Sequence, residues 1–347
     1  MRSGAGRGMT KAFITGVSGA ALTADERAFL AGERPWGLIL FARNCLEPAQ
    51  VADLTAAFRD AVGWHAPVLV DQEGGRVQRL RPPHWRRYPP ARAFGRLYAA
   101  DPAAGIEAAE LVTRLMAADL SAVGIDVDCL PVLDVPVPGV HDVIGDRAYA
   151  ATADAIVPLA AAAVRGLMAG GVLPVMKHIP GHGRTMVDSH LALPVVAASR
   201  SVLEESDFVP FRAFAHLPLA MTAHMVFEAI DPAAPATQSP VVIGAIIRGH
   251  IGFHGALMSD DLSMQALEGD LGTRAARAFA AGCDLALHCN GRMDEMLAVA
   301  AASPLLTGEA ARRCDAALAH RTPPQPFNEA RAMSLMERIA GLAAEVA

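Results

Sequence analysis

Short apolar runs alternate with longer amphipathic segments along most of the chain. The short runs have the length and the branched or leucine-rich composition of buried strands, while the longer segments repeat apolar residues with the period of a helix. Predicted strands lie at residues 12–16, 37–41, 67–70, 124–129, 173–176, 219–222, 256–259 and 284–288. Predicted helices between them include residues 24–31, 48–62, 104–123, 153–169, 202–214, 241–251 and 273–281.

Eight strands that each lead into a helix predict an α/β fold, a single TIM-like (β/α)8 barrel of parallel strands. An open doubly wound sheet would show the same alternation. Such a sheet usually has a glycine-rich phosphate turn after its first strand, whereas residues 16–19 read GVSG here. The sequence therefore favours the barrel.

Both ends of the chain depart from this alternation. Helical sequence continues to about His320, a proline-rich break spans residues 323–326, and a terminal helix is predicted at residues 328–345. These segments predict a C-terminal helical extension. Residues 1–8 lack the apolar stretch of a signal peptide and are expected to form a flexible extension, so that residues 9–347 form one catalytic domain.

Composition narrows the class of protein. The residues are 52% hydrophobic but only 5% aromatic, which suits helices packed closely around a sheet. The 30 basic and 36 acidic residues give a net charge of -6, which argues against a nucleic-acid or anionic-membrane partner and favours a small-molecule partner.

The cysteine pattern and the hydropathy of the chain indicate the cellular compartment of the protein. The five cysteines are scattered without a CxxC pair, so neither a disulfide framework nor a zinc ribbon is predicted, and a reducing cytoplasm fits best. The longest apolar run, residues 155–164, has about half the length of a membrane span. We expect a cytoplasmic monomer without a transmembrane helix.

Unusually polar segments follow several of the predicted strands. In a barrel the active site lies at the carboxyl ends of the strands, so these segments are the informative ones. They are residues 71–81 (DQEGGRVQRLR), 177–190 (KHIPGHGRTMVDSH), 223–228 (AHMVFE) and the pair Asp260 and Asp261.

The segment 177–190 has the strongest signal for chemistry. His190 lies two residues after Asp188, which allows the carboxylate to accept a hydrogen bond from one ring nitrogen while the other faces a substrate. Such a pair suits general acid/base catalysis near neutral pH. A turn capped by Asp188 would have the same spacing, and spacing alone does not separate the two interpretations.

A zinc site is the alternative for the same segment, with His178, His182, Asp188 and His190 as ligands. There is no HExxH motif, and two histidines four residues apart on a loop with proline and glycine lack the shared helical face of a ligand pair. We therefore expect no metal and no cofactor.

Carboxylates near two other strand ends add candidates. Asp260 and Asp261 point to opposite faces of a strand, so one is a candidate nucleophile, although both would also suit the cap of a helix starting near Leu262. After the third strand, carboxylates and arginines suit the recognition of sugar hydroxyls, although a surface ion-pair cluster would look similar. These residues are Asp71, Glu73, Arg76 and Arg79.

Three motifs in this order resemble family 3 glycoside hydrolases, and specifically the bacterial single-domain β-N-acetylglucosaminidases. They are DQEGGRVQRL at 71–80, KHIPGHG with DSH at 177–190, and SDDLSM at 259–264. The resemblance runs from about residue 15 to residue 289. It implies a retaining exo-hydrolase that removes terminal β-linked N-acetylglucosamine (GlcNAc) from 1,6-anhydro-N-acetylmuramyl (anhydroMurNAc) muropeptides in peptidoglycan recycling.

The resemblance also implies roles for single residues. Asp260 would be the nucleophile and His190 the general acid/base, with Asp188 as its partner. The residues implied in holding the sugar are Asp71, Arg79, Lys177, His178 and, in the less distinctive stretch VIGDRAY, Arg147. A histidine proton donor departs from the usual pair of carboxylates in glycosidases.

Three alternatives stay open. The same fold could act as a GlcNAc phosphorylase, because a histidine repels incoming phosphate less than a glutamate does. Hydrolysis could instead be assisted by the substrate's 2-acetamido group, without an ester on Asp260. A noncatalytic muropeptide-binding sensor would keep Asp71 and Arg79 but would not need the acid/base pair.

Overall fold

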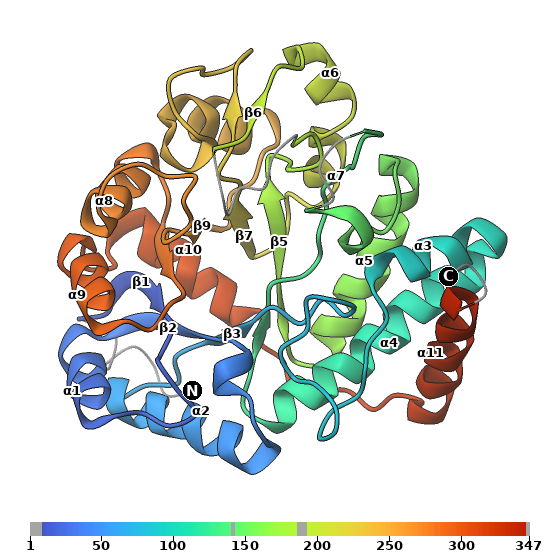
Figure 1. The fold of residues 1–347 in the computed structure, drawn as a ribbon, viewed down its shortest axis with the longest axis horizontal. Coiled ribbons are helices and arrows are strands. Elements are labelled where there is room, and N and C mark those ends of the chain that lie inside the picture. Colours follow the sequence, from blue (N-terminus) through green and yellow to red (C-terminus); the bar gives the residue numbers. More distant parts are fainter. Residues whose placement is uncertain (1–8, 140–142, 186–192, 345–347) are drawn as a thin grey trace.

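The computed structural model describes residues 9–139, 143–185 and 193–344. Eight parallel strands close into a barrel in the order β1-β10-β9-β7-β5-β4-β3-β2 (Figure 1). The TIM-like (β/α)8 fold predicted from the alternation is confirmed. The strands are β1 (Lys11–Thr15), β2 (Pro35–Leu40), β3 (Val68–Val70), β4 (Val127–Asp128), β5 (Leu173–Ile179), β7 (Leu219–Thr222), β9 (Ala256–Asp261) and β10 (Leu285–His288).

Two strands run further than predicted. The sequence placed the ends of β5 and β9 at residues 176 and 259, where the apolar runs stop, but β5 continues to Ile179 and β9 to Asp261. Parallel pairing with the neighbouring strands holds these polar residues in the ladder, since Lys177 pairs with Met221 and Asp261 with Leu287. Lys177, His178, Asp260 and Asp261 therefore stand on strands rather than on loops.

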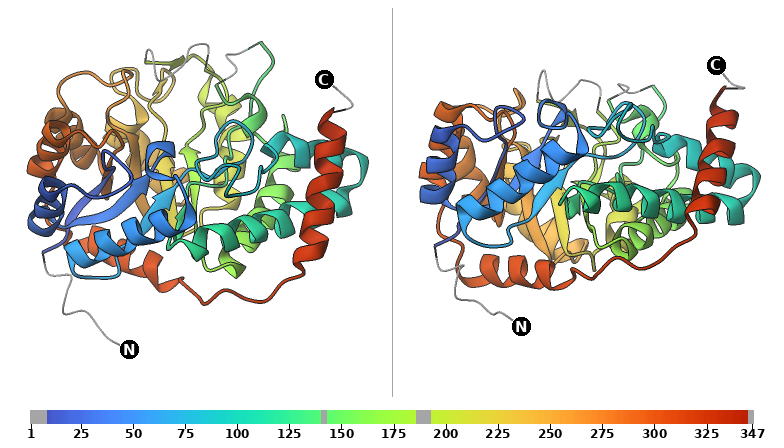
Figure 2. Two further views of the ribbon diagram at one scale, coloured as in Figure 1. Left: turned by 60° about the horizontal axis from the view of Figure 1, so that its bottom comes forward. Right: turned by 90° about the horizontal axis from the view of Figure 1, so that it is seen from below.

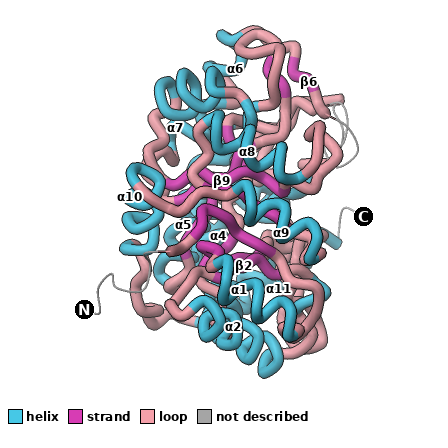
Figure 3. Tube along the Cα trace, turned by 90° about the vertical axis from the view of Figure 1, so that its left-hand side faces the viewer, coloured by secondary structure: helices cyan, strands magenta, loops and turns pink. Residues whose placement is uncertain are grey.

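Helices surround the barrel, as Figure 3 shows for one side of the molecule. They are α1 (Ala24–Glu33), α2 (Pro48–Val62), α3 (Ala91–Ala100), α4 (Pro102–Ala122), α5 (Ala153–Ala169), α6 (Arg200–Glu205), α7 (Phe208–Ala213), the π-helical η4 (Val242–His250), α8 (Leu271–Ala281), α9 (Met293–Ala302), α10 (Gly308–Ala319) and α11 (Glu329–Ala344). Short 3-10 segments are η1 (Ala42–Asn44), η2 (Gly145–Arg147) and η3 (Ala236–Gln238). A small parallel pair, β6 (Val195–Val196) with β8 (Val226–Phe227), lies apart from the barrel.

The helix predicted at residues 202–214 is interrupted. It forms α6 and α7, which are separated at Ser206 and Asp207. Pro210 has no N–H to donate to the carbonyl of Ser206, so a continuous helix would lose a hydrogen bond there. The helix predicted at 241–251 is present but adopts the wider π coil.

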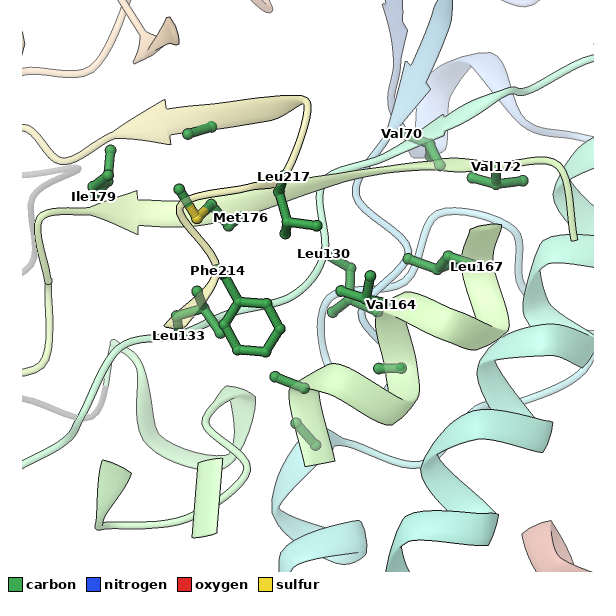
Figure 4. Close-up of a cluster of buried hydrophobic side chains, with 14 of the residues drawn as sticks. Val70, Leu130, Leu133, Val164, Leu167, Val172, Met176, Ile179, Phe214 and Leu217 are labelled. Carbon is green, nitrogen blue, oxygen red and sulfur yellow. The ribbon is translucent and has the colours of Figure 1, made fainter. Parts of the chain in front are cut away.

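Alternate strand residues separate two apolar layers. Ile14, Leu69, Val175 and Met258 belong to the cluster inside the barrel. Their neighbours along the strands face the surrounding helices, and Figure 4 shows two residues of this outer layer: Val172, just before β5, near Leu167 of α5, and Met176 near Leu217. Side chains along a strand alternate between the two faces. At the carboxyl end of each strand, this alternation determines which polar side chains point into the mouth of the barrel.

The chain after the last barrel strand packs against the barrel through α10 and against α3 and α4 through α11. Figure 2 shows α10 along one edge of the molecule. Cys314, Ala317 and Leu318 of α10 join the interior cluster. The following segment leads to α11, which contacts α3 and α4. This is the C-terminal helical extension expected from the sequence. None of the helices within the described residues is long and apolar enough to cross a membrane.

Packing of α5 on the barrel predicts a stability effect. Leu167 is fully buried, and its truncation in Leu167→Ala leaves a cavity, so the free energy of unfolding is expected to fall by about 3 kcal/mol in urea titration. Leu297→Ala on α9 is the control, because Leu297 is 49% exposed and its loss is expected to cost about 0.5 kcal/mol or less. Equal effects in the two variants would contradict this packing.

Candidate functional site

A polar cavity of about 170 Å³ lies where the strands end. It is smaller than the usual site for a drug-sized ligand, so it suits one ring-sized unit of a larger molecule. Its polar and charged lining residues are Asp71, Glu73, Arg79, Arg147, Lys177, His178, His182, Asp260 and Asp261. Apolar walls come from Ile39, Phe41, Met221, Met264 and Leu287 among others.

Three of these polar residues lie on the inward-facing side of their strands or of the strand's continuation. Leu69, Val175 and Met258 face the inside of the barrel. Two residues further along lie Asp71, Lys177 and Asp260, which are therefore in phase with the interior and line the cavity. The inward-facing positions are therefore apolar inside the barrel and polar at its mouth.

His178 is out of phase with Lys177, and yet both line the cavity. Adjacent residues of a regular strand point to opposite faces. Here the register of β5 against β7 shifts between Lys177 and Ile179, which breaks the regular alternation at His178.

A buried ion network holds one wall of the cavity. The Lys177 ammonium lies 2.8 Å from Asp71 Oδ1 and 2.6 Å from Glu73 Oε1. Arg79 Nη2 donates to Asp71 Oδ2 at 3.0 Å. Arg147 binds Glu73 with two hydrogen bonds of 2.8 and 2.9 Å.

This network keeps its members charged although they are buried. Burial acts to raise the pKa of Asp71 and Glu73, but Lys177, Arg79 and Arg147 outweigh it: the pKa of Asp71 lies far below its usual value and that of Glu73 falls to about 2. Burial acts to lower the pKa of Lys177, and the two carboxylates reverse this and hold it above its usual value. The cavity therefore presents fixed charges at neutral pH.

The two adjacent acids of β9 have different surroundings, although both line the cavity. Asp261 accepts hydrogen bonds from the N–H and the hydroxyl of Ser263 and from the N–H of Cys289. These bonds hold a turn at this point, so Asp261 does not cap a helix starting near Leu262. The next helix is α8, which begins at Leu271, close to the predicted 273, and is capped by Asp270. Asp260 accepts from the Asp261 N–H at 2.8 Å.

Asp260 is ionised in this setting. Burial acts to raise its pKa, but His178, His224 and the Asp261 N–H outweigh it, so the pKa of Asp260 lies below its usual value. An ionised carboxylate in phase with the barrel interior can act as a nucleophile or stabilise positive charge.

A second His–Asp pair lies beside it. His178 Nδ1 is 2.7 Å from Asp134 Oδ2, and Asp134 Oδ1 accepts from the backbone N–H of His182 at 2.6 Å. The His178 and His182 rings lie 5.5 Å apart. Burial and the nearby His178 lower the pKa of His182 to about 4, so its ring is neutral at neutral pH.

The structure brings together six of the eight candidates derived from the sequence. They are Asp71, Arg79, Arg147, Lys177, His178 and Asp260. The other two, His190 and Asp188, lie outside the described residues. Arg76 is 44% exposed in its side chain and pairs with Asp146, which fits the surface ion pair left open for this cluster.

The sequence did not single out Asp134 or His224, and it grouped Glu73 with Asp71 and Arg79 for sugar recognition without predicting its ion pairs with Lys177 and Arg147. Asp134 follows β4 within the apolar run LPVLDV, and a lone acid in such a run signals a buried, paired carboxylate. His224 is buried, with its ring nitrogens at Thr237 Oγ1 and the carbonyl oxygen of Asp261. Only the tertiary structure links it to the strand that bears Asp260.

The metal alternative involved His178, His182, His190 and Asp188, of which the first two are described. Among the described residues, no group of three or more His, Cys, Asp and Glu side chains is placed to bind one metal ion.

Comparison with known proteins gives a consistent result. The model of the glycosyl hydrolase family 3 N-terminal domain matches residues 12–320. A β-hexosaminidase of Alkalilimnicola ehrlichii is 44% identical over 281 residues, which cover 80% of each chain. A β-hexosaminidase of Pseudomonas aeruginosa is 41% identical over 299 residues, which cover 84% of this chain and 86% of the relative.

Solved structures agree. NagZ from Neisseria gonorrhoeae, in complex with N-trifluoroacetyl-D-glucosamine, superposes with a TM-score of 0.84 at 32% identity, covering 95% of this chain and 97% of that one. A family 3 β-N-acetylglucosaminidase from Paenibacillus has a TM-score of 0.83 at 32% identity, covering 96% of this chain and 67% of that one.

The ion network predicts a pH-dependent contribution to stability. Because the pKa of Glu73 is about 2 when folded against a usual 4.5, its ion pairs stabilise the fold above pH 4.5, and this contribution is lost as the pH falls from 4.5 towards 2. Glu73→Gln is expected to lower the free energy of unfolding by about 3 kcal/mol at pH 7. Urea titrations should show the gap to the parent protein narrowing between pH 7 and pH 3.5.

Glu110→Gln is the matched control, because the Glu110 side chain is 41% exposed and pairs with Arg165 on the surface. Its cost is expected to be about 1 kcal/mol or less. A loss in Glu73→Gln that is the same at both pH values would show that shape, and not charge, accounts for the effect.

Proposed function

The chain belongs to glycosyl hydrolase family 3, and from this premise we propose that it is a retaining exo-β-N-acetylglucosaminidase that removes terminal β-linked GlcNAc from 1,6-anhydroMurNAc muropeptides. The observation that carries the proposal is the small charged cavity in which Asp260 lies among the proposed sugar-binding residues. The β-hexosaminidase relatives and the NagZ neighbour bound to a glucosamine derivative support the GlcNAc specificity.

The size and lining of the cavity support exo cleavage. A volume of about 170 Å³ suits one sugar ring rather than an extended oligosaccharide. Carboxylates accept hydrogen bonds from hydroxyl groups, and the ammonium and guanidinium groups donate to hydroxyl oxygens. We assign this recognition to Asp71, Arg79, Arg147, Lys177 and His178.

The proposed reaction begins with the ionised Asp260. Its carboxylate attacks the anomeric carbon while the bond to the leaving oxygen breaks, and this oxygen takes a proton from protonated His190. The product is a glycosyl ester on Asp260. Neutral His190 then removes a proton from water, which attacks the same carbon and releases GlcNAc with Asp260 as a free carboxylate.

Two displacements on one carbon retain its configuration. The lowered pKa of Asp260 supports its role, because only the ionised carboxylate is a nucleophile. The roles of His190 and of its partner Asp188 rest on the DSH motif at residues 188–190. Asp188 would hold the imidazole in place and raise its proton affinity.

The setting of the enzyme belongs to the same proposal. Muropeptides released during peptidoglycan recycling would reach a cytoplasmic monomer in which residues 9–347 act as one catalytic domain. The reaction requires no cofactor, because the nucleophile and the acid/base are both side chains.

Turnover of an aryl β-GlcNAc substrate and of GlcNAc-anhydroMurNAc tests the assignment. Asp260→Asn is expected to lose about 10³-fold or more in kcat, since no ester can form, and His190→Ala about 10²- to 10⁴-fold. A 2- or 5-fluoro glycoside should label Asp260. The control is Asp270→Asn, which alters an exposed helix cap after the same strand and should leave turnover unchanged.

Intact turnover in both active-site variants would overturn the site assignment, and a fluoro glycoside that fails to label Asp260 would favour assistance by the acetamido group. A parent protein that binds muropeptide without turning it over would be a sensor.

Product analysis in phosphate buffer separates hydrolysis from phosphorolysis. Water as the second nucleophile is expected to give GlcNAc at all phosphate concentrations. Chromatography that detects GlcNAc-1-phosphate in proportion to phosphate would identify a phosphorylase instead.

A further inference from the structure

Two neighbours define the protonation of the His178 ring. Its Nδ1 lies 2.7 Å from Asp134 Oδ2, and its Nε2 lies 3.4 Å from Arg147 Nη2. A guanidinium group only donates hydrogen bonds, and a carboxylate only accepts them. The arrangement therefore fits one tautomer, in which Nδ1 carries the proton and the lone pair of Nε2 faces Arg147 across a contact of 3.4 Å, longer than a normal hydrogen bond.

Asp134 also accepts hydrogen bonds from the backbone. Its Oδ1 accepts from the backbone N–H groups of His182 at 2.6 Å and of His178 at 3.3 Å, and the side chain is fully buried. Both oxygens are thus required as acceptors. Burial acts to raise the pKa of Asp134, but His178 outweighs it and keeps the carboxyl ionised.

The backbone aligns this carboxylate with the ring. The segment after β4 runs beside β5, because the Lys177 N–H donates to the carbonyl of Pro131 at 3.0 Å and the Leu133 N–H donates to the carbonyl of Lys177 at 2.8 Å. Asp134, the next residue, therefore reaches His178 from a paired and rigid element.

We propose that Asp134 is a positioning residue that fixes His178 in the Nδ1–H tautomer, so that Nε2 presents a hydrogen-bond acceptor to a hydroxyl group of the bound sugar. Lys177, Arg79 and Arg147 supply donors in the same cavity. A hydroxyl that donates to Nε2 and accepts from one of these cations is recognised through both its proton and its lone pair. The sugar part of this inference rests on the proposed function, whereas the tautomer does not.

An amide at position 134 cannot replace the carboxylate. If the amide oxygen of the Asp134→Asn variant accepted from the Nδ1–H, its NH2 group would face the two backbone N–H donors. If the amide were flipped, the NH2 group would donate to Nδ1, and the proton would move to Nε2, where it would face Arg147. The second arrangement satisfies the backbone and turns the acceptor into a donor.

The first test is the ¹⁵N spectrum of the imidazole rings in the intact, unliganded protein. The chain has 12 histidines, and the resonance absent from His178→Gln identifies this ring. We expect protonated Nδ1 and unprotonated Nε2 at neutral pH, and the reverse in Asp134→Asn. Protonated Nε2 in the parent protein would overturn the proposal even if the variant failed to fold.

The second test is kinetic, with an aryl β-GlcNAc substrate. Asp134→Asn is expected to reduce kcat/KM by about 10- to 100-fold, mainly through KM, because a contact to the bound sugar is lost. Adding His178→Gln should cost little more, since both changes remove one interaction. Losses that multiply would show that Asp134 acts independently of His178 and would overturn the proposal.

Asp284→Asn is the matched control. Asp284 is also a buried carboxylate that accepts from a backbone N–H and from two arginines, but it lies at the start of β10, at the opposite end of the barrel. It should lower stability without changing kcat/KM. If the parent protein does not turn over the substrate, the proposed function fails, while the ¹⁵N spectrum still decides the tautomer.

Discussion

The ion pairs between the buried Lys177 ammonium and the carboxylates of Asp71 and Glu73 hold the mouth of the barrel together. The Lys177 side chain is 2% exposed, and its charge is stable there only with such partners, because burying an unpaired charge costs several kcal/mol. The three residues come from β5 and from the segment after β3, which are separated by β4 in the barrel. The pairs therefore bridge the mouth across an intervening strand.

A chain of contacts between charged and polar side chains extends from these ion pairs. Glu73 is shared by Lys177 and Arg147, and Arg147 in turn reaches His178, which contacts Asp134. Lys177, Arg79 and Arg147 are each paired with a carboxylate, so these side chains need little rearrangement to receive a polar ligand. A site preorganised in this way stabilises developing charge better than water does, because its dipoles are already oriented.

The apolar layers make this polar arrangement possible. Interior residues such as Leu69, Val175 and Met258 fill the barrel beneath the cavity, while α10 contributes Cys314, Ala317 and Leu318 to the same cluster. Strands held on both faces can extend beyond their apolar runs without fraying. For this reason Lys177 and Asp260 stand on rigid strands, and the ion pairs with Lys177 hold Asp71 and Glu73, from the segment after β3, against this frame.

Strand period and the rule that barrel sites lie at the carboxyl ends of strands predicted the barrel, most strand positions and candidates such as Asp71 and Lys177, because these are local properties of the chain. Arg147 was implied only by the motif resemblance. The strand period left open which of Asp260 and Asp261 points into the barrel, and the motif resemblance chose Asp260. In the structure both acids line the cavity, and Asp260 is the one in phase with the barrel interior. The sequence did not single out Asp134, whose function depends on a ring 44 residues away. Pairings between distant segments, and the protonation states that follow from them, are decided only by the tertiary structure, because burial and neighbouring charge do not exist until the chain has folded.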